Sequence, residues 1–180
     1  MSIINRLVSV NQTSAHARRP ATAAETRALS HPLRLRIIRL LYDGPLSNRM
    51  LATRLGEHPA TVLHHVRTLA RTGFVEPAGE QPGARGTVEK LYRSTGKSWR
   101  LSIDEAEGAG AVSRAGVHAF TEELREAGDD LDMSRLALVI SPERLDALKT
   151  RIAAVLDEYA EHDDPGGERW AVFTAYHRRA

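Results

Sequence analysis

The stretch GPLSNRMLATRLGEHPATVLHHVRTLARTGFVE, residues 44–76, decides the fold. It predicts two short helices joined by a tight turn and followed directly by a strand. Ser47 is a favourable N-cap for the first helix, because its hydroxyl can accept a hydrogen bond from a first-turn amide. Gly56 ends that helix, and Pro59 suits the first turn of the next one, where an amide proton has no intrahelical acceptor. Gly73 ends the second helix.

The second helix of this stretch has one apolar face and one polar face. Val62, Val66 and Leu69 recur at spacings of four and three, which is typical of a helix packed on a core. Each residue turns a helix by about 100°. The residues roughly opposite the apolar face are therefore Ala60, His64, Arg67 and Arg71, and those along one flank are Thr61, His65 and Thr68. A helix pair whose second member has such a donor-rich face is the helix-turn-helix pattern, which places that helix in the DNA major groove.

Residues 74–93 predict a β-hairpin. Apolar and polar residues alternate on both sides of AGEQPGARG, residues 78–86, where glycine and proline cluster. A hairpin directly after a recognition helix is the wing of a winged helix-turn-helix domain. We expect a mobile tip with Arg85 and a return strand with Lys90, two cations within reach of DNA phosphates.

Two further helices are predicted before residue 44. Thr22 and Glu25 have the spacing of a capping box and begin a helix that ends near Leu29. His31 and Pro32 precede a second helix, residues 33–42. We expect the four helices to share one core, formed by Leu29, Ile37, Leu41, Leu51, Leu55, Val62, Val66 and Leu69. Residues 1–21 are expected to be a flexible arm with one short helix at residues 3–10.

Charge is distributed unevenly along the chain. Residues 1–103 contain 16 Lys and Arg against 6 Asp and Glu, a net charge of +10, whereas residues 104–180 contain 9 against 17, a net of −8. A domain with this excess of cations has the electrostatic character of a nucleic-acid-binding domain. A solvated basic surface, or one that meets membranes or acidic proteins, is the alternative.

Composition excludes several other classes. The 180 residues include no cysteine, which rules out disulfides, thiolate metal sites and cysteine nucleophiles. No apolar run approaches the roughly 18 residues of a membrane span, and residues 1–12 lack the features of a signal peptide. We therefore expect a cytoplasmic protein with no membrane partner. None of the motifs of common enzyme active sites is present, so we expect no catalytic activity.

Residues 103–180 predict a region for dimerisation. A second capping box at Ser102 predicts a helix over residues 103–127, whose apolar stripe could meet a second subunit: Val117, Phe120 and Leu124. A strand at 136–140, a helix at 142–161 and a strand at 169–176 then form a layer too small to be stable alone. Its aromatic residues could form part of a core or line a ligand pocket.

Two motifs in this order resemble the ArsR-like winged-helix transcription regulators. They are ALSHPLR (28–34) followed by IIRLL (37–41), and PATVLHHVRTL (59–69) followed by GFVE (73–76), and the resemblance covers residues 24–95. It implies a homodimeric regulator, usually a repressor, that binds a near-palindromic operator. It also implies that certain residues lie near base edges and phosphates: His58, Ala60, Thr61, His64 and Arg67. His65 falls where the family often has a histidine, with a role in packing or a backbone contact.

The chain departs from this family in its metal ligands. The helix before the predicted recognition helix has no cysteine, and the helix after the wing offers only His118 and Glu122. Zinc needs a complete tetrahedral shell, so we expect no metal and no cofactor. A metal- or small-molecule-responsive regulator, or a winged helix used only for protein contacts, remains the alternative function.

These inferences give a mainly α-helical fold with a small β component. The expected domains are an arm at 1–21, a winged helix-turn-helix domain at 22–102 that binds a double-stranded operator, and a C-terminal dimerisation region at 103–180. The DNA-binding residues predicted from all these patterns are Ser47, His58, Ala60, Thr61, His64, Arg67, Arg71, Arg85 and Lys90.

Overall fold

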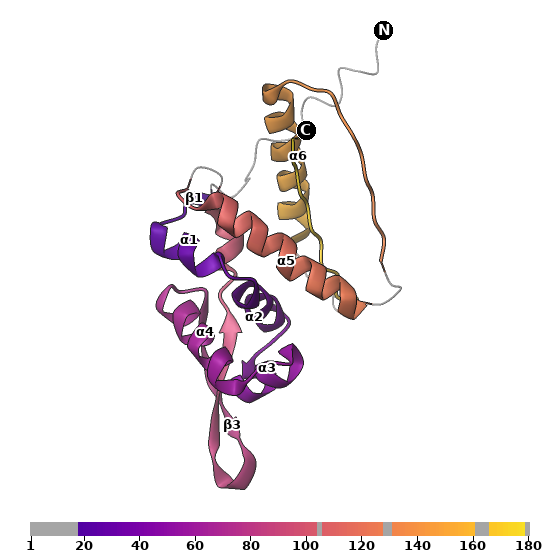
Figure 1. The fold of residues 1–180 in the computed structure, drawn as a ribbon. Helices are drawn as coiled ribbons and strands as arrows, with labels where there is room; N and C mark the ends of the chain where they lie inside the picture. Colours follow the sequence, from indigo (N-terminus) through magenta and orange to yellow (C-terminus); the bar gives the residue numbers. More distant parts are fainter. Residues whose placement is uncertain (1–17, 104–105, 128–130, 161–165, 179–180) are drawn as a thin grey trace. The chain divides into compact units, whose positions relative to one another are not determined.

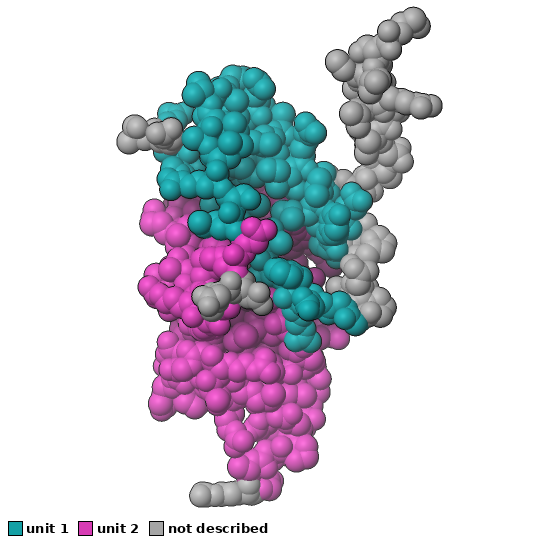
Figure 2. Space-filling view, turned by 90° about the vertical axis from the view of Figure 1, so that its right-hand side faces the viewer, with its two compact units in different colours: residues 1–17, 133–180 teal, residues 18–132 magenta. Residues whose placement is uncertain are grey.

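The computed structural model describes residues 18–103, 106–127, 131–160 and 166–178. They form two compact units (Figures 1 and 2). In chain order the first unit spans residues 18–132, which Figure 2 shows in magenta as unit 2, and the described part of the second lies within residues 133–178, shown in teal as unit 1. The first unit therefore ends well beyond residue 102, where the predicted winged domain stops. The helix predicted at residues 3–10 lies outside the described residues.

The first unit contains the helix-turn-helix pair, the hairpin and a long following helix (Figure 1). In chain order its elements are β1 (Arg19–Pro20), α1 (Ala23–Leu29), α2 (Pro32–Tyr42), β2 (Leu46–Ser47), α3 (Asn48–Leu55), α4 (Pro59–Arg71), β3 (Val75–Pro82), η2 (Ala84–Gly86), β4 (Val88–Ser94), η3 (Lys97–Arg100), β5 (Leu101–Ser102) and α5 (Ala109–Ala127). An antiparallel sheet has the strand order β2-β4-β3, and β1 pairs with β5 in parallel. The mainly helical class with a small sheet is confirmed.

Local sequence signals place the helix ends. The capping box of α1 is confirmed, with the Thr22 hydroxyl and the Glu25 carboxylate each bonded to the other residue's backbone amide. Ser47 caps α3 through the amide of Met50, and Gly56 ends it in the left-handed conformation, with φ of 67°. That conformation strains any residue with a Cβ, which is why glycine stands there.

The predicted core is confirmed. All eight apolar residues expected from α1 to α4 lie in one buried cluster. The strands complete it, because Val75 of β3, Leu46 of β2 and Leu101 of β5 are also buried there, together with Phe74 just before β3. The helix pair is thus held by packing on α1, α2 and the base of the hairpin.

The buried carboxylate of Glu25 joins the N-terminal part of this unit to the segment that follows the wing. Glu25 is 5% exposed, and its oxygens accept hydrogen bonds from Arg19 at 2.6 and 2.9 Å. Lys97 forms an ion pair with the same carboxylate at 2.6 Å and also donates to the Thr72 carbonyl at the end of α4. The Arg19 guanidinium, with help from Lys97 and Thr22, holds the pKa of Glu25 far below its usual range.

The wing is more regular than its sequence predicts. Residues 78–86 were expected to form a long tip, but β3 continues to Pro82, and Glu80 pairs with Lys90. The pairing register of β3 and β4 shifts between Pro77 and Glu80, and beyond this shift the two strands remain paired as far as Pro82. The glycine and proline content of the segment is thus absorbed within the ladder, and only η2 forms the tip.

The helix expected from residue 103 begins later. Ser102 lies in β5 rather than at a helix N-cap, and α5 starts at Ala109, after Gly108 with φ of 88°. A left-handed residue cannot lie within an α-helix, so the helix forms only beyond it. Ala115 and Ala119 are the buried residues of α5, which lies along α1 and α2 (Figure 1).

The second unit contains α6 (Pro142–Ala160), close to the predicted helix at 142–161. The predicted strands at 136–140 and 169–176 are wrong for this structure, which assigns no strand to either segment. A strand needs a neighbouring ladder to satisfy its backbone groups. The apolar residues of segments 136–140 and 169–176 are largely exposed, for example Val139 and Trp170. No described helix is both long enough and apolar enough to cross a membrane.

We predict that Glu25→Gln strongly destabilises the protein. Removing the carboxylate charge leaves two cations without their anion, and breaking a buried ion pair costs about 3 kcal/mol. Urea unfolding should therefore show a lower free energy of unfolding. The matched control is Glu126→Gln, which breaks the more exposed pair with Arg36 and should cost less than about 1 kcal/mol. Equal effects of the two changes would contradict the central role of Glu25.

Candidate nucleic-acid interface

The outer face of α4 brings together most of the predicted DNA-binding residues. Val62, His65, Val66 and Leu69 are buried on its inner side. The four residues predicted opposite the apolar stripe are all exposed: Ala60, His64, Arg67 and Arg71. Among them, His64, Arg67 and Arg71 line an open depression together with Ala70. Of the predicted flank, Thr61 is exposed, Thr68 is half-buried and His65 is buried.

The N-terminus of α4 is fixed by its capping residue. His58 Nδ1 accepts a hydrogen bond from the Ala60 amide at 3.2 Å, and the ring itself is exposed. Asn48 of α3 donates to the Pro59 carbonyl at 3.0 Å, which fixes the turn between the two helices. The first turn contains no acidic residue. The positive end of the helix dipole is thus available to an anion.

The recognition helix also has cations that are not neutralised within the chain. Within the described residues, no salt bridge involves Arg67 or Arg71. Arg71 makes only a long hydrogen bond of 3.4 Å to the Thr68 hydroxyl. Their guanidinium groups can therefore form bidentate contacts with phosphates or guanine.

Ser47 must be removed from the predicted DNA contacts. It is 1% exposed, and its hydroxyl accepts the Met50 amide while it hydrogen-bonds Glu89, whose pKa it lowers. The residue that caps α3 is thus enclosed by the wing and cannot reach a ligand. Sequence alone does not reveal this, because the burial of Ser47 depends on β4, which lies about 40 residues further along the chain.

The wing has two described cations, and one of them, Arg93, is paired with Glu76. Lys90 is exposed on β4, opposite Glu80 of β3. Arg85 belongs to η2 at the tip, and its side chain lies outside the described part of the chain. The wing and α4 are connected directly through Thr72 to Phe74.

A buried imidazole lies beneath the outer face of α4. His65 is 8% exposed, its ring centroid is 4.4 Å from that of His31 and 5.5 Å from that of His64, and its Nδ1 has no hydrogen-bond partner. Burial, with smaller contributions from the nearby His31, Arg34 and His64, lowers the pKa of His65 to about 4. His65 therefore packs as a neutral ring, in line with the packing role expected for it.

The predicted dimer stripe lies on α5. Val117 is half exposed, whereas Phe120 and Leu124 are partly buried. Ala115 and Ala119, two residues to either side of Val117, are buried, so Val117 lies on the side of α5 that faces away from α1 and α2. On the same helix Glu122 pairs with Arg125, and the described residues contain no group of three or more His, Asp or Glu that could hold a metal ion.

We predict that His65 makes stability depend on pH. Its pKa is lower in the folded state than the unfolded value near 6.5, so the unfolded state binds the proton more readily. The free energy of unfolding should fall as pH decreases from about 6.5 to about 4, by up to roughly 3 kcal/mol. Thermal unfolding of the protein and of His65→Gln across this range measures the effect.

The matched control for this experiment is His64→Gln, which alters the exposed neighbouring ring. It should retain most of the pH dependence, because burial, the largest cause of the lowered pKa of His65, is unchanged, whereas His65→Gln should lose much of it. Parallel curves for the wild type and His65→Gln would show that the buried ring does not control this transition.

One comparison identifies part of the chain. Residues 29–78 match a family model described as a helix-turn-helix domain. A search of curated proteins gives no match.

Solved structures of similar proteins include a ZitR mutant from Lactococcus lactis in apo form (18% identity, 74% of this chain and 85% of that chain, TM-score 0.32) and AdcR from Streptococcus pyogenes (15%, 71% and 80%, TM-score 0.32). A third is a MepR mutant from an S. aureus clinical isolate (14%, 77% and 78%, TM-score 0.27). The family match identifies residues 29–78 as a helix-turn-helix domain, and the hairpin of β3 and β4 directly after α4 gives it the form of a winged helix-turn-helix.

Proposed function

We propose that the chain is a homodimeric repressor that binds a near-palindromic operator. The observation that supports it best is the division of α4 into a face buried in the core and a face with unneutralised cations. In this proposal α4 enters the major groove and the wing contacts the neighbouring backbone. Two such helices in a dimer would contact half-sites about 34 Å apart.

The exposed residues of α4 have distinct roles in this complex. Thr61, His64 and Arg67 lie on the central part of the outer face and contact base edges, and Ala60 allows the helix to approach the groove closely. His58, Arg71, Arg85 and Lys90 contact phosphates, which position the domain without reading sequence. Arg67 is the main reader, since a guanidinium can bond both acceptors of a guanine.

Dimerisation is assigned to residues 103–180. The outward side of α5 bears Val117 and Leu124, which have helical spacing of seven and so share a face. The segments around α6 expose further apolar residues that a second subunit would cover. We place the protein in the cytoplasm, where its operator lies, and assign it no catalytic activity.

The proposal is tested by selecting genomic DNA fragments with the purified protein and sequencing them. The best site is then titrated over a salt series. A palindromic motif with a steep decrease of affinity with salt supports the proposal. No enrichment over random fragments would contradict it and favour the alternative, a winged helix for protein contacts.

We predict that Arg67→Ala weakens operator binding by about 1–3 kcal/mol, because it removes a base contact. Its affinity for random duplex DNA should fall less, so that specificity is reduced. Fluorescence anisotropy with labelled duplexes measures both affinities. Arg125→Ala is the control, an exposed arginine on α5, and should bind as the wild type does. Equal affinities of Arg67→Ala and the wild type would exclude the reading role of Arg67.

We predict that Val117→Asp dissociates the dimer, because a charge on the interface must be desolvated without a partner. Light scattering should change from twice the chain mass to the 19.9 kDa of one chain. Val88→Asp makes the same change at another exposed valine, on the wing, and should remain dimeric. A monomeric wild type, or a dimeric Val117→Asp protein, would show that this face of α5 is not the interface.

A further inference from the structure

Two helices of the first unit begin in the same way. His31 is the N-cap of α2, which begins at Pro32, and His58 is the N-cap of α4, which begins at Pro59. In each case the imidazole Nδ1 accepts a hydrogen bond of 3.2 Å from the backbone amide two residues further along the chain. A neutral imidazole whose Nδ1 is an acceptor has its proton on Nε2. Neither helix has an acidic residue in its first turn. Each cap thus combines a ring donor with the positive end of a helix dipole.

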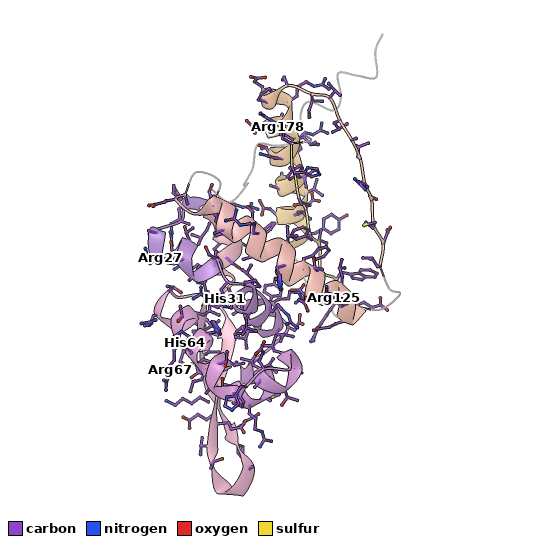
Figure 3. The ribbon with its side chains drawn as sticks, viewed as in Figure 1. Arg27, His31, His64, Arg67, Arg125 and Arg178 are labelled. Atoms are coloured by element: carbon purple, nitrogen blue, oxygen red, sulfur yellow. The ribbon has the colours of Figure 1, made fainter. Side chains whose placement is uncertain are left out.

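The cap of α2 lies next to the recognition helix. The His31 ring contacts the His65 ring of α4, which in turn contacts the His64 ring on the outer face. Figure 3 shows His31 with Arg27, His64 and Arg67 along one side of the first unit. The feature is therefore continuous with the DNA-binding face and not an isolated charged spot.

Two arginines accompany His31. Arg34 Nη2 donates to the Arg27 carbonyl at 2.8 Å, which brings the end of α1 and the start of α2 together. We call Arg27, His31 and Arg34 the α1–α2 patch. The Glu57 carboxylate, which is exposed, acts on His31 and partly offsets the effects of burial and of Arg34, which lower the pKa of His31.

The cations of this patch lack internal anions. In the described ranges no salt bridge involves Arg27 or Arg34, whereas Arg36 and Arg39, further along α2, pair with Glu126 and Asp43. Arg34 Nε is also buried without a hydrogen-bond partner. A partly buried guanidinium without a counter-charge is costly, and an anion at the patch would offset that cost.

We propose that the α1–α2 patch binds backbone phosphates of the duplex that flank the bases contacted by α4. The proposal rests on the proposed function and extends its footprint beyond the helix pair and the wing. Duplex DNA is the favoured occupant because the patch adjoins the α4 face and repeats the cap at the start of α4. Contacts of this kind add affinity that does not depend on sequence.

The test measures the affinity of the full chain for its selected operator, with and without flanking base pairs, over a salt series. Arg27→Gln removes an exposed charge, and it should weaken binding to the long duplex and reduce the salt slope by about 0.9. Random duplex should be weakened by the same factor as the operator. On a duplex cut back to the bases under α4, the variant and the wild type should bind alike.

Two further variants make the result decisive. Arg125→Gln, a matched charge change on α5, should leave affinity and salt slope unaltered. His31→Asn keeps a favoured capping residue but removes the ring donor, and it should lower affinity for the long duplex by about threefold, the value of one hydrogen bond.

If Arg27→Gln and His31→Asn bind the long duplex with the affinity and salt slope of the wild type, the proposal that the α1–α2 patch binds phosphates is wrong. If Arg67→Ala still weakens binding in that case, the proposed function stands without it. Failure of the wild type to bind any duplex would overturn both proposals.

Discussion

The structure depends most on one buried carboxylate. Glu25 is enclosed between α1 and the segment that follows the wing, and a charged group in such a place is stable only when every oxygen is hydrogen-bonded. Arg19, Thr22 and Lys97 provide these bonds, and Lys97 also donates to the carbonyl of Thr72. The same lysine lies over the Phe74 ring, 5.2 Å from its centroid. The C-terminus of α4 is thus held by the ion pair that joins α1 to the chain beyond the hairpin.

Both ends of the recognition helix are therefore fixed, and by different means. Its start is fixed locally by the His58 cap and the bond from Asn48 to Pro59, whereas its end is fixed by Lys97, 25 residues from Thr72. This difference explains which parts of the fold are predictable from sequence. Caps, helical spacing and turn residues act within a few positions, so α1 to α4 and their core were predicted closely. A partnership such as Glu25 with Lys97 has no local signal, and only the capping role of Glu25 could be inferred.

The same limit explains the predictions that failed. The segments at 136–140 and 169–176 have the composition of strands, but composition does not specify a ladder partner, and in this structure they have none. Ser47 was included among the predicted DNA-binding residues, yet its burial by the wing depends on a strand distant in sequence. Conversely, the outer face of α4 follows from helical geometry alone and was predicted residue by residue. His31 was not among the predicted DNA contacts, and the only sequence signal for the role now proposed for it is the His-Pro pair repeated at 31–32 and 58–59.

The ion pairs determine where the excess positive charge of residues 1–103 lies on the surface. Four of the six acidic residues in this range are used in salt bridges, and they neutralise cations away from α4: Glu25 with Arg19 and Lys97, Asp43 with Arg39, Glu76 with Arg93, and Glu89 with Arg49. The cations left without such partners include Arg67 and Arg71 on α4 and Arg27 and Arg34 beside it. Internal pairing therefore does more than stabilise the fold. Because these carboxylates are paired with other cations, the net positive charge is concentrated on and beside the outer face of α4. On the proposed DNA-binding surface, each such cation would displace a counterion from DNA.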